Sequence, residues 1–220
     1  MIDADLKLYY ARRAREYEEI YLKPERQTDI AALKRRVAEL LTGCDVIEIA
    51  CGTGYWTQVF APVARSVHAT DVNTEVLELA RAKNLPADRV SFALGDAYQP
   101  DGSAREFSAA FASFWWSHVP RKRLPEFLQA LHRALAPGAR VVFIDNLYVP
   151  GNSSPISRSD DEGNTYQTRT LKDGSAYEVL KNFPDEREVE ALLSQRATEI
   201  NLERLTYYWC LSYRVRALNA

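Results

Sequence analysis

The sequence contains few cysteines and no long apolar run. Its three cysteines, Cys44, Cys51 and Cys210, follow neither a paired nor a metal-ligand spacing, which excludes a disulfide framework and favours a reducing, cytoplasmic compartment. No stretch reaches the roughly 18 consecutive apolar residues of a transmembrane helix, and the charged amino terminus lacks the apolar core of a signal peptide. We therefore expect a soluble protein without a membrane partner.

Neither sign of charge predominates. The chain has 28 Lys and Arg against 30 Asp and Glu, so its net charge is -2. No basic field is available to hold a phosphate backbone, and we expect no nucleic-acid partner. The 220 residues, 46% of them hydrophobic, suffice for the core of a single domain spanning residues 1–220, as a monomer or homodimer.

Apolar periodicity predicts alternating strands and helices. The expected strands cover 46–49, 66–70, 89–94, 107–114 and 139–144, followed by an antiparallel pair at 198–204 and 207–216. The expected helices cover 28–42, 55–60, a segment from 74, 121–136 closed by Pro137-Gly138, and 185–194, with Thr28 and Thr74 as N-caps and Gly43 as a stop. This alternation is typical of an α/β fold with a parallel sheet and helices on both faces.

Residues 150–183 interrupt the alternation. They are rich in Gly, Ser, Asp and Pro but contain short alternating pieces. A segment of this length is rarely an idle connection. We interpret it as a partly ordered insertion that covers the carboxyl edge of the sheet, with a hairpin turn at 171–175. It would separate a core at 28–149 from a helix and strand pair at 184–220.

A glycine turn follows the first predicted strand. Gly52 and Gly54 lie where open α/β sheets bind ligands, outside the carboxyl ends of the strands. Gly-Xaa-Gly alone also opens dinucleotide sites, but that fingerprint needs a third glycine where this chain has Thr57. The pattern thus disfavours an NAD-dependent oxidoreductase.

Acidic residues surround this turn. Asp71 ends the second strand, where a carboxylate can accept both hydroxyls of a ribose, and Asp96 ends the third, where it can accept from an adenine amine. Glu48 adds negative charge before the turn, and no Lys or Arg in the turn faces a phosphate. A cationic nucleoside suits these residues better than a pyrophosphate.

The segment Glu48-Ile49-Ala50-Cys51-Gly52-Thr53-Gly54, with Asp71 and Gly95-Asp96-Ala97, resembles the cofactor site of the class I S-adenosylmethionine-dependent methyltransferases of the small-molecule type. The resemblance implies a Rossmann-like, doubly wound, mainly parallel seven-stranded sheet with an antiparallel C-terminal strand, helices on both faces and an N-terminal helical cover at 1–27. It also implies S-adenosylmethionine as cofactor and S-adenosylhomocysteine as product. By this likeness the cofactor is surrounded by Glu48, Ala50, Gly52 and Gly54 at the methionine portion, Asp71 and Val72 at the ribose, and Asp96 and Ala97 at the adenine.

Aromatic and titratable side chains are the candidates for the reacting end. Aromatic faces bind cations, so Tyr9, Tyr10 and Trp115 are candidates to contact the sulfonium, core packing being the alternative. His118 is a candidate base, or else a histidine bonded to a carbonyl. Asp145 is expected to face the acceptor or hold the insertion, and its pairing with one amide makes a poor magnesium site, so no metal is expected.

Four polar residues of the insertion can reach an acceptor or lie at the surface. They are Arg158, Tyr166, Arg169 and Lys181, and we expect each to be solvated.

The sequence predicts a methyltransferase acting on a small molecule at an O, N, S or C nucleophile by in-line displacement. An aromatic-lined pocket would suit a planar or apolar acceptor. The motif Asn/Asp-Pro-Pro-Tyr/Phe, typical of amino methyltransferases of macromolecules, is absent after the fourth strand. A macromolecular acceptor and a non-catalytic binder of the cofactor remain the alternatives.

Overall fold

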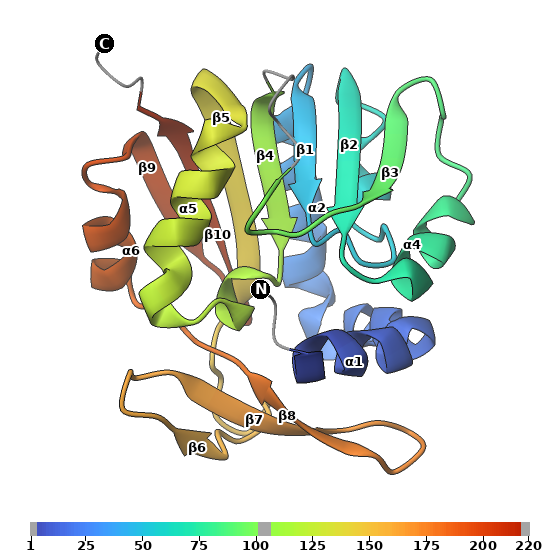
Figure 1. Cartoon of the computed structure of the whole chain (residues 1–220), viewed down its shortest axis with the longest axis vertical. Coiled ribbons are helices and arrows are strands. Elements are labelled where there is room, and N and C mark those ends of the chain that lie inside the picture. The colour runs from blue at the N-terminus through green and yellow to red at the C-terminus, as the bar shows by residue number, and fades with distance from the viewer. Residues whose placement is uncertain (1–3, 101–106, 217–220) are drawn as a thin grey trace.

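A central seven-stranded sheet has the order β3-β2-β1-β4-β5-β10-β9 in the computed structural model, which describes residues 4–100 and 107–216 (Figure 1). The strands are β1 Asp45–Ile49, β2 Ser66–Asp71, β3 Val90–Leu94, β4 Phe107–Ser113, β5 Leu135–Asn146, β9 Ala197–Arg204 and β10 Tyr208–Val215. Strands β1 to β5 pair in parallel, and β10 is antiparallel to β5 and β9. The predicted mainly parallel sheet with an antiparallel C-terminal strand is confirmed. Successive strands are added toward one edge of the sheet from β1 to β3 and toward the other edge with β4 and β5. Such sheets bind ligands at the point between β1 and β4 where this order switches.

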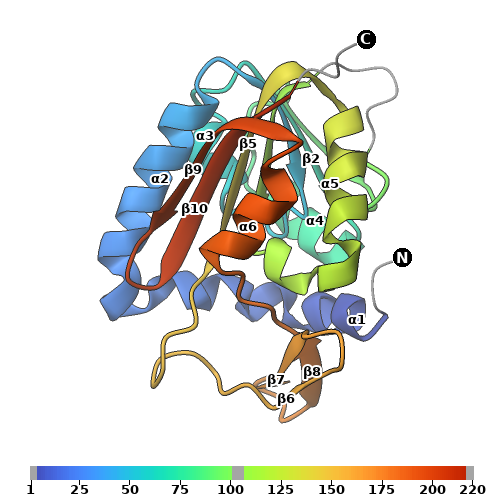
Figure 2. The same cartoon turned by 90° about the vertical axis from the view of Figure 1, so that its left-hand side faces the viewer.

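Helices cover both faces of this sheet (Figure 2). They are α2 Gln27–Leu41, α3 Thr57–Phe60, α4 Thr74–Arg81, α5 Leu124–Arg133 and α6 Glu186–Leu193. Side chains alternate between the faces along a strand, so Val46 of β1 packs in one core with Val37 and Phe60. Its neighbour Ile47 packs in the other core with Leu128 of α5. None of the described helices is long and apolar enough to span a bilayer.

The carboxyl ends of the parallel strands are covered by the amino-terminal segment and a second sheet (Figure 1). The amino-terminal segment comprises α1 Ala4–Arg13 and the 3₁₀ helices η1 Ala14–Leu22 and η2 Pro24–Arg26. The second sheet is antiparallel and comprises β6 Arg158–Ser159, β7 Thr165–Thr170 and β8 Ala176–Leu180. The two are joined where Arg12 donates to the hydroxyl of Tyr177 at 2.7 Å.

The insertion contains the hairpin that the sequence predicts. The amide of Leu171 donates to the carbonyl of Ser175 at 2.9 Å, closing the turn between β7 and β8. The second sheet gives this segment more regular structure than its composition indicates.

Several predicted boundaries were wrong. The helix expected to end at Pro137-Gly138 ends at Arg133, because Leu135 already pairs with β4 and the strand runs through a register shift that tolerates proline. Thr28 and Thr74 do not cap helices: α2 continues directly from η2, and Asn73 occupies the N-cap position of α4. Gly43 does terminate α2, with a φ of +72°.

Candidate functional site

The turn after β1 has a left-handed backbone. Ala50, Gly52 and Gly54 have φ values of 52°, 57° and 73°. An added Cβ at Gly52 would meet no atom within 4 Å, whereas at Gly54 it would lie 3.1 Å from Cβ of Ala80 on α4. Gly52 therefore exposes its backbone to the adjoining cavity, and Gly54 instead lets α4 approach the turn closely.

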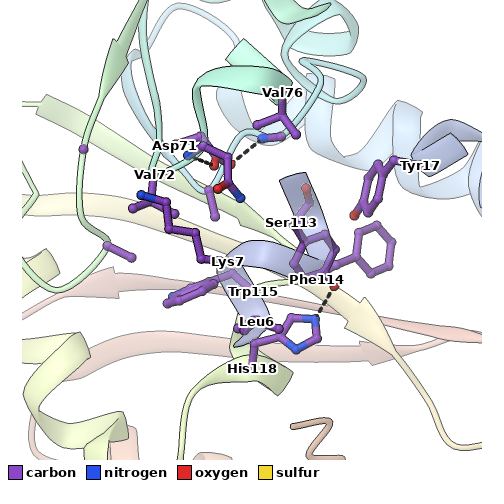
Figure 3. Close-up of a pocket in the computed structure, with 16 residues that line it drawn as sticks. Leu6, Lys7, Tyr17, Asp71, Val72, Val76, Ser113, Phe114, Trp115 and His118 are labelled. Atoms are coloured by element: carbon purple, nitrogen blue, oxygen red, sulfur yellow. Dashed lines mark hydrogen bonds between the residues drawn. The ribbon is translucent and has the colours of Figure 1, made fainter. Parts of the chain in front are cut away.

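Asp71 fixes this turn from the end of β2 (Figure 3). Its Oδ2 accepts the amide of Gly52 and its Oδ1 accepts the amide of Asn73, both at 2.9 Å. Burial raises the pKa of the Asp71 carboxyl, and these backbone hydrogen bonds oppose the shift. A carboxylate has about four lone-pair sites, so each oxygen retains capacity for a ligand hydroxyl.

The first cavity lies beside this turn and is walled mainly by apolar side chains (Figure 3). Eight of the predicted site residues line it, namely Tyr10, Ala50, Gly52, Asp71, Val72, Ala97, Trp115 and His118. Sequence reasoning missed Leu6 and Lys7 of α1 and Val76 of α4. No motif marks them, and only the expectation of a helical cover pointed to α1.

Four predicted cofactor residues do not line this cavity: Tyr9, Glu48, Gly54 and Asp96. Glu48 is fully buried behind the turn, where its Oε2 accepts the hydroxyl of Thr57 at 2.6 Å. Burial raises the pKa of Glu48 to about 8. The carboxylate of Asp96 accepts the amide of Tyr98 at 2.9 Å and so shapes the loop whose neighbouring residues do line the cavity.

The segment after β4 closes the cavity. Phe114 has a positive φ of 56°, unusual for a bulky residue, and its amide is fixed by the carbonyl of Ile144 at 2.8 Å. Trp115 is buried and contacts Phe127 edge-on at a ring separation of 6.2 Å. Trp115 therefore both packs in the core and lines the cavity.

His118 links α1 to the second sheet. Its Nδ1 lies 2.6 Å from the carbonyl of Leu180, which requires Nδ1 to carry a proton. Its Nε2 lies 2.6 Å from the Tyr10 hydroxyl, which therefore donates to it. Burial, helped by the charge of Lys181, lowers the pKa of His118 to about 3, so the ring is neutral.

Asp145 lines neither this cavity nor the second cavity described below. It is fully buried and pairs with Nζ of Lys181 at 2.9 Å, while its other oxygen accepts the amide of Ser117 at 3.0 Å. Burial alone would raise the pKa of Asp145, but the charge of Lys181 and the hydrogen bonds from Lys181 and the Ser117 amide act together in the opposite direction, and that pKa is lowered. Among the described residues, no group of three or more His, Cys, Asp and Glu side chains is placed to hold a metal ion.

The expectation that four insertion residues are solvated was partly wrong. Lys181 is buried at 4% exposure, and Arg169 and Tyr166 are half-buried. Arg158 is exposed as expected and pairs with Glu178. Lys181 is buried with Asp145 and Ser117, to which its Nζ donates at 2.9 and 2.6 Å.

A second cavity adjoins the first. The two share Tyr10, Tyr17, Phe114 and His118, so they meet at the reacting end that the sequence predicts. Tyr9 lines the second cavity, where its hydroxyl accepts from Arg13 at 2.9 Å.

Comparisons with known proteins agree with this architecture. Residues 46–138 match the family model of a methyltransferase domain. Magnesium-protoporphyrin O-methyltransferase of Rhodobacter capsulatus is 28% identical over 143 residues, covering 60% of this chain and 64% of that protein. Demethylmenaquinone methyltransferase of Clavibacter sepedonicus is 34% identical over 116 residues, covering 52% of this chain and 45% of that protein. The chain thus spans less than two thirds of the length of these curated relatives.

A solved structure, the complex of DhpI with SAM and HEP, is 27% identical, covers 97% of this chain and 100% of its own, and superposes with a TM-score of 0.78. The match extends over the amino-terminal segment and the second sheet as well as the central sheet. Residues 46–138 therefore form a methyltransferase domain, and the chain as a whole has the fold of the class I S-adenosylmethionine-dependent methyltransferases, whose cofactor is S-adenosylmethionine.

Proposed function

We propose that this protein is an enzyme that transfers a methyl group from S-adenosylmethionine to a small-molecule acceptor. One observation carries the proposal: two cavities meet at Tyr10, Phe114 and His118, and the first has Asp71 at its far wall. The first cavity provides a place for the cofactor beside the glycine turn, and the second provides a separate place for an acceptor.

The residues of the first cavity fit the cofactor. Asp71 has acceptor capacity for ribose hydroxyls, and Gly52 offers open backbone beside it. Ala50 lies at the same turn for the methionine portion, Val72 lies next to Asp71 for the ribose, and Ala97 provides an apolar wall for the adenine. Glu48, Gly54 and Asp96 shape this site from behind, and we propose that they position the residues in contact.

When bound there, S-adenosylmethionine would supply an electrophilic methyl group for in-line transfer to the acceptor, and S-adenosylhomocysteine would remain. Tyr10, Phe114 and Trp115 exclude water from the place where this happens, and their ring faces favour a nearby cation.

We propose positioning roles for the two predicted catalytic residues. The neutral ring of His118 holds the Tyr10 hydroxyl at the junction of the cavities. Asp145 holds Lys181 and the backbone of Ser117 below that junction.

A small acceptor is favoured over a macromolecule because the α1 segment and the second sheet cover the carboxyl edge (Figure 1). The curated relatives named above are methyltransferases of a porphyrin and a quinone, in keeping with this class. We further propose a single domain, a monomer or homodimer, without nucleic-acid partners. The free thiols of Cys44, Cys51 and Cys210 suit a cytoplasmic location.

The test is to incubate the protein with methyl-labelled S-adenosylmethionine and a size-fractionated cell extract. Label is expected in the small-molecule fraction, and Asp71→Asn should abolish its transfer. Asp88→Asn, which changes an exposed carboxylate outside the first cavity, is the matched control and should transfer label normally. Label in protein or RNA would instead indicate a macromolecular acceptor, and cofactor binding without any transfer would indicate a non-catalytic binder.

A further inference from the structure

The second cavity is strongly cationic. Five basic side chains line it, namely Arg13, Lys23, Arg26, Arg169 and Lys181, and no Asp or Glu is among its described lining residues. Lys181 is neutralised by Asp145 at 2.9 Å. The remaining positive charges face the cavity without a carboxylate in its wall.

The three arginines are held by neutral groups. Arg169 donates to the hydroxyl of Ser154 at 2.9 Å and to Oε1 of Gln167 at 2.6 Å. Arg13 donates to the Tyr9 hydroxyl at 2.9 Å.

Arg26 is held in the same way. It donates to the hydroxyl of Tyr208 at 3.3 Å and to Oδ1 of Asn152. Its buried Nε has no hydrogen-bond partner in the described chain, and none of the three arginines forms an ion pair with a described carboxylate. The guanidinium groups are therefore positioned but not neutralised.

The charges also oppose one another. Burial lowers the pKa of the Arg169 guanidinium, and the positive charges of Arg13 and Arg26 act in the same direction. Gathering like charges in a covered cavity is unfavourable unless a ligand of opposite charge offsets it. Guanidinium groups bind planar carboxylates and phosphate-type oxyanions through paired hydrogen bonds.

We propose that the second cavity binds the methyl acceptor through an oxyanion, a carboxylate or a phosphate-type group, held by Arg13, Arg26 and Arg169. This inference rests on the proposed function. The acceptor is then a small anion whose reactive atom extends toward Tyr10 and Phe114, where the cavities meet. The sequence does not reveal this cluster, because its three arginines come from segments far apart in the chain.

Calorimetric titration at low ionic strength tests the proposal, with inorganic phosphate and acetate as probes and acetamide as the neutral counterpart. Each titration is done with and without S-adenosylhomocysteine, so that the anion site is tested whether or not the first cavity is filled. We expect saturable binding of phosphate, acetate or both, the tighter of the two identifying the oxyanion, and no comparable binding of acetamide.

Arg169→Gln and, separately, Arg13→Gln should weaken this binding about tenfold or more, since each removes charged hydrogen bonds. Arg187→Gln removes an exposed arginine of α6 outside the second cavity and should leave the affinity unchanged. Retained binding of S-adenosylhomocysteine shows that a variant is folded. The proposal is overturned if the wild-type protein binds neither anion, if acetamide binds as well as acetate, or if both variants keep full affinity. If the wild-type protein does not bind S-adenosylhomocysteine, the result would instead contradict the proposed function.

Discussion

Replacing Glu48 by Gln should change how the stability of the protein depends on pH. The carboxyl is fully buried, its Oε1 has no described hydrogen-bond partner, and burial raises its pKa from the ordinary 4.5 to about 8. Between these values the folded protein keeps a proton that the unfolded chain has released, so this group makes the free energy of unfolding fall as pH rises.

The size of the effect follows from the shift. One pKa unit corresponds to about 1.4 kcal/mol, so the contribution lost between pH 5 and pH 8 is roughly 3–4 kcal/mol. Gln keeps an oxygen that can accept the Thr57 hydroxyl but cannot ionise. Relative to the wild type, the free energy of unfolding of the variant should therefore rise by roughly 3–4 kcal/mol between pH 5 and pH 8.

Urea unfolding of the ligand-free protein, followed by tryptophan fluorescence at pH 5 and pH 8, measures this difference. Glu78→Gln, which changes an exposed glutamate of α4, serves as the control and should follow the wild type at both pH values. The quantity compared is the free energy of unfolding of Glu48→Gln minus that of the wild type. If this difference changes by less than about 1 kcal/mol between pH 5 and pH 8, Glu48 is not a buried carboxyl that keeps its proton.

Three further outcomes are expected. Lys181→Met leaves the Asp145 carboxylate buried without its cation and should lower the free energy of unfolding by about 3–5 kcal/mol in urea titrations, whereas adding Asp145→Asn should restore much of the loss. Gly54→Ala combines a φ of +73° with a Cβ 3.1 Å from that of Ala80 and should cost at least about 1–2 kcal/mol in the same assay; an unchanged midpoint would contradict the close approach of α4. The His118 ring, whose pKa is lowered to about 3 by burial, should remain neutral with a proton on Nδ1 from pH 8 to pH 5 in ¹⁵N nuclear magnetic resonance spectra, and titration within that range would contradict its burial.

Local pattern was enough to predict the framework of the cofactor site. A short β-branched strand followed by Gly52, and another that ends in Asp71, indicate where the carboxyl edge lies, because parallel strands bring their ends to the same side of a sheet. In the structure Asp71 lies at the cavity wall beside Gly52, whose amide donates to Oδ2 of Asp71 at 2.9 Å. The end of the helix predicted at Pro137-Gly138 was wrong, because proline and glycine are found both after helices and at irregular positions in strands.

The contacts on the acceptor side of the site could not be predicted from local sequence patterns. The partner of His118 is the carbonyl of Leu180, and any residue type offers a carbonyl, so nothing in the sequence marks the pair. The buried pair of Asp145 and Lys181 joins β5 to the end of the second sheet. Charged residues are usually exposed, so the sequence does not indicate that these two are buried. Pairings of this kind depend on tertiary packing alone.

We propose that the first cavity binds S-adenosylmethionine with Asp71 on its ribose. Calorimetric titration of S-adenosylmethionine into the wild-type protein and the Asp71→Asn variant tests it most directly. We predict one molecule bound per chain and an affinity about tenfold or more lower in the variant, since a charged acceptor and its hydrogen bonds are lost. No saturable binding by the wild type, or equal affinity in the two proteins, would contradict the account.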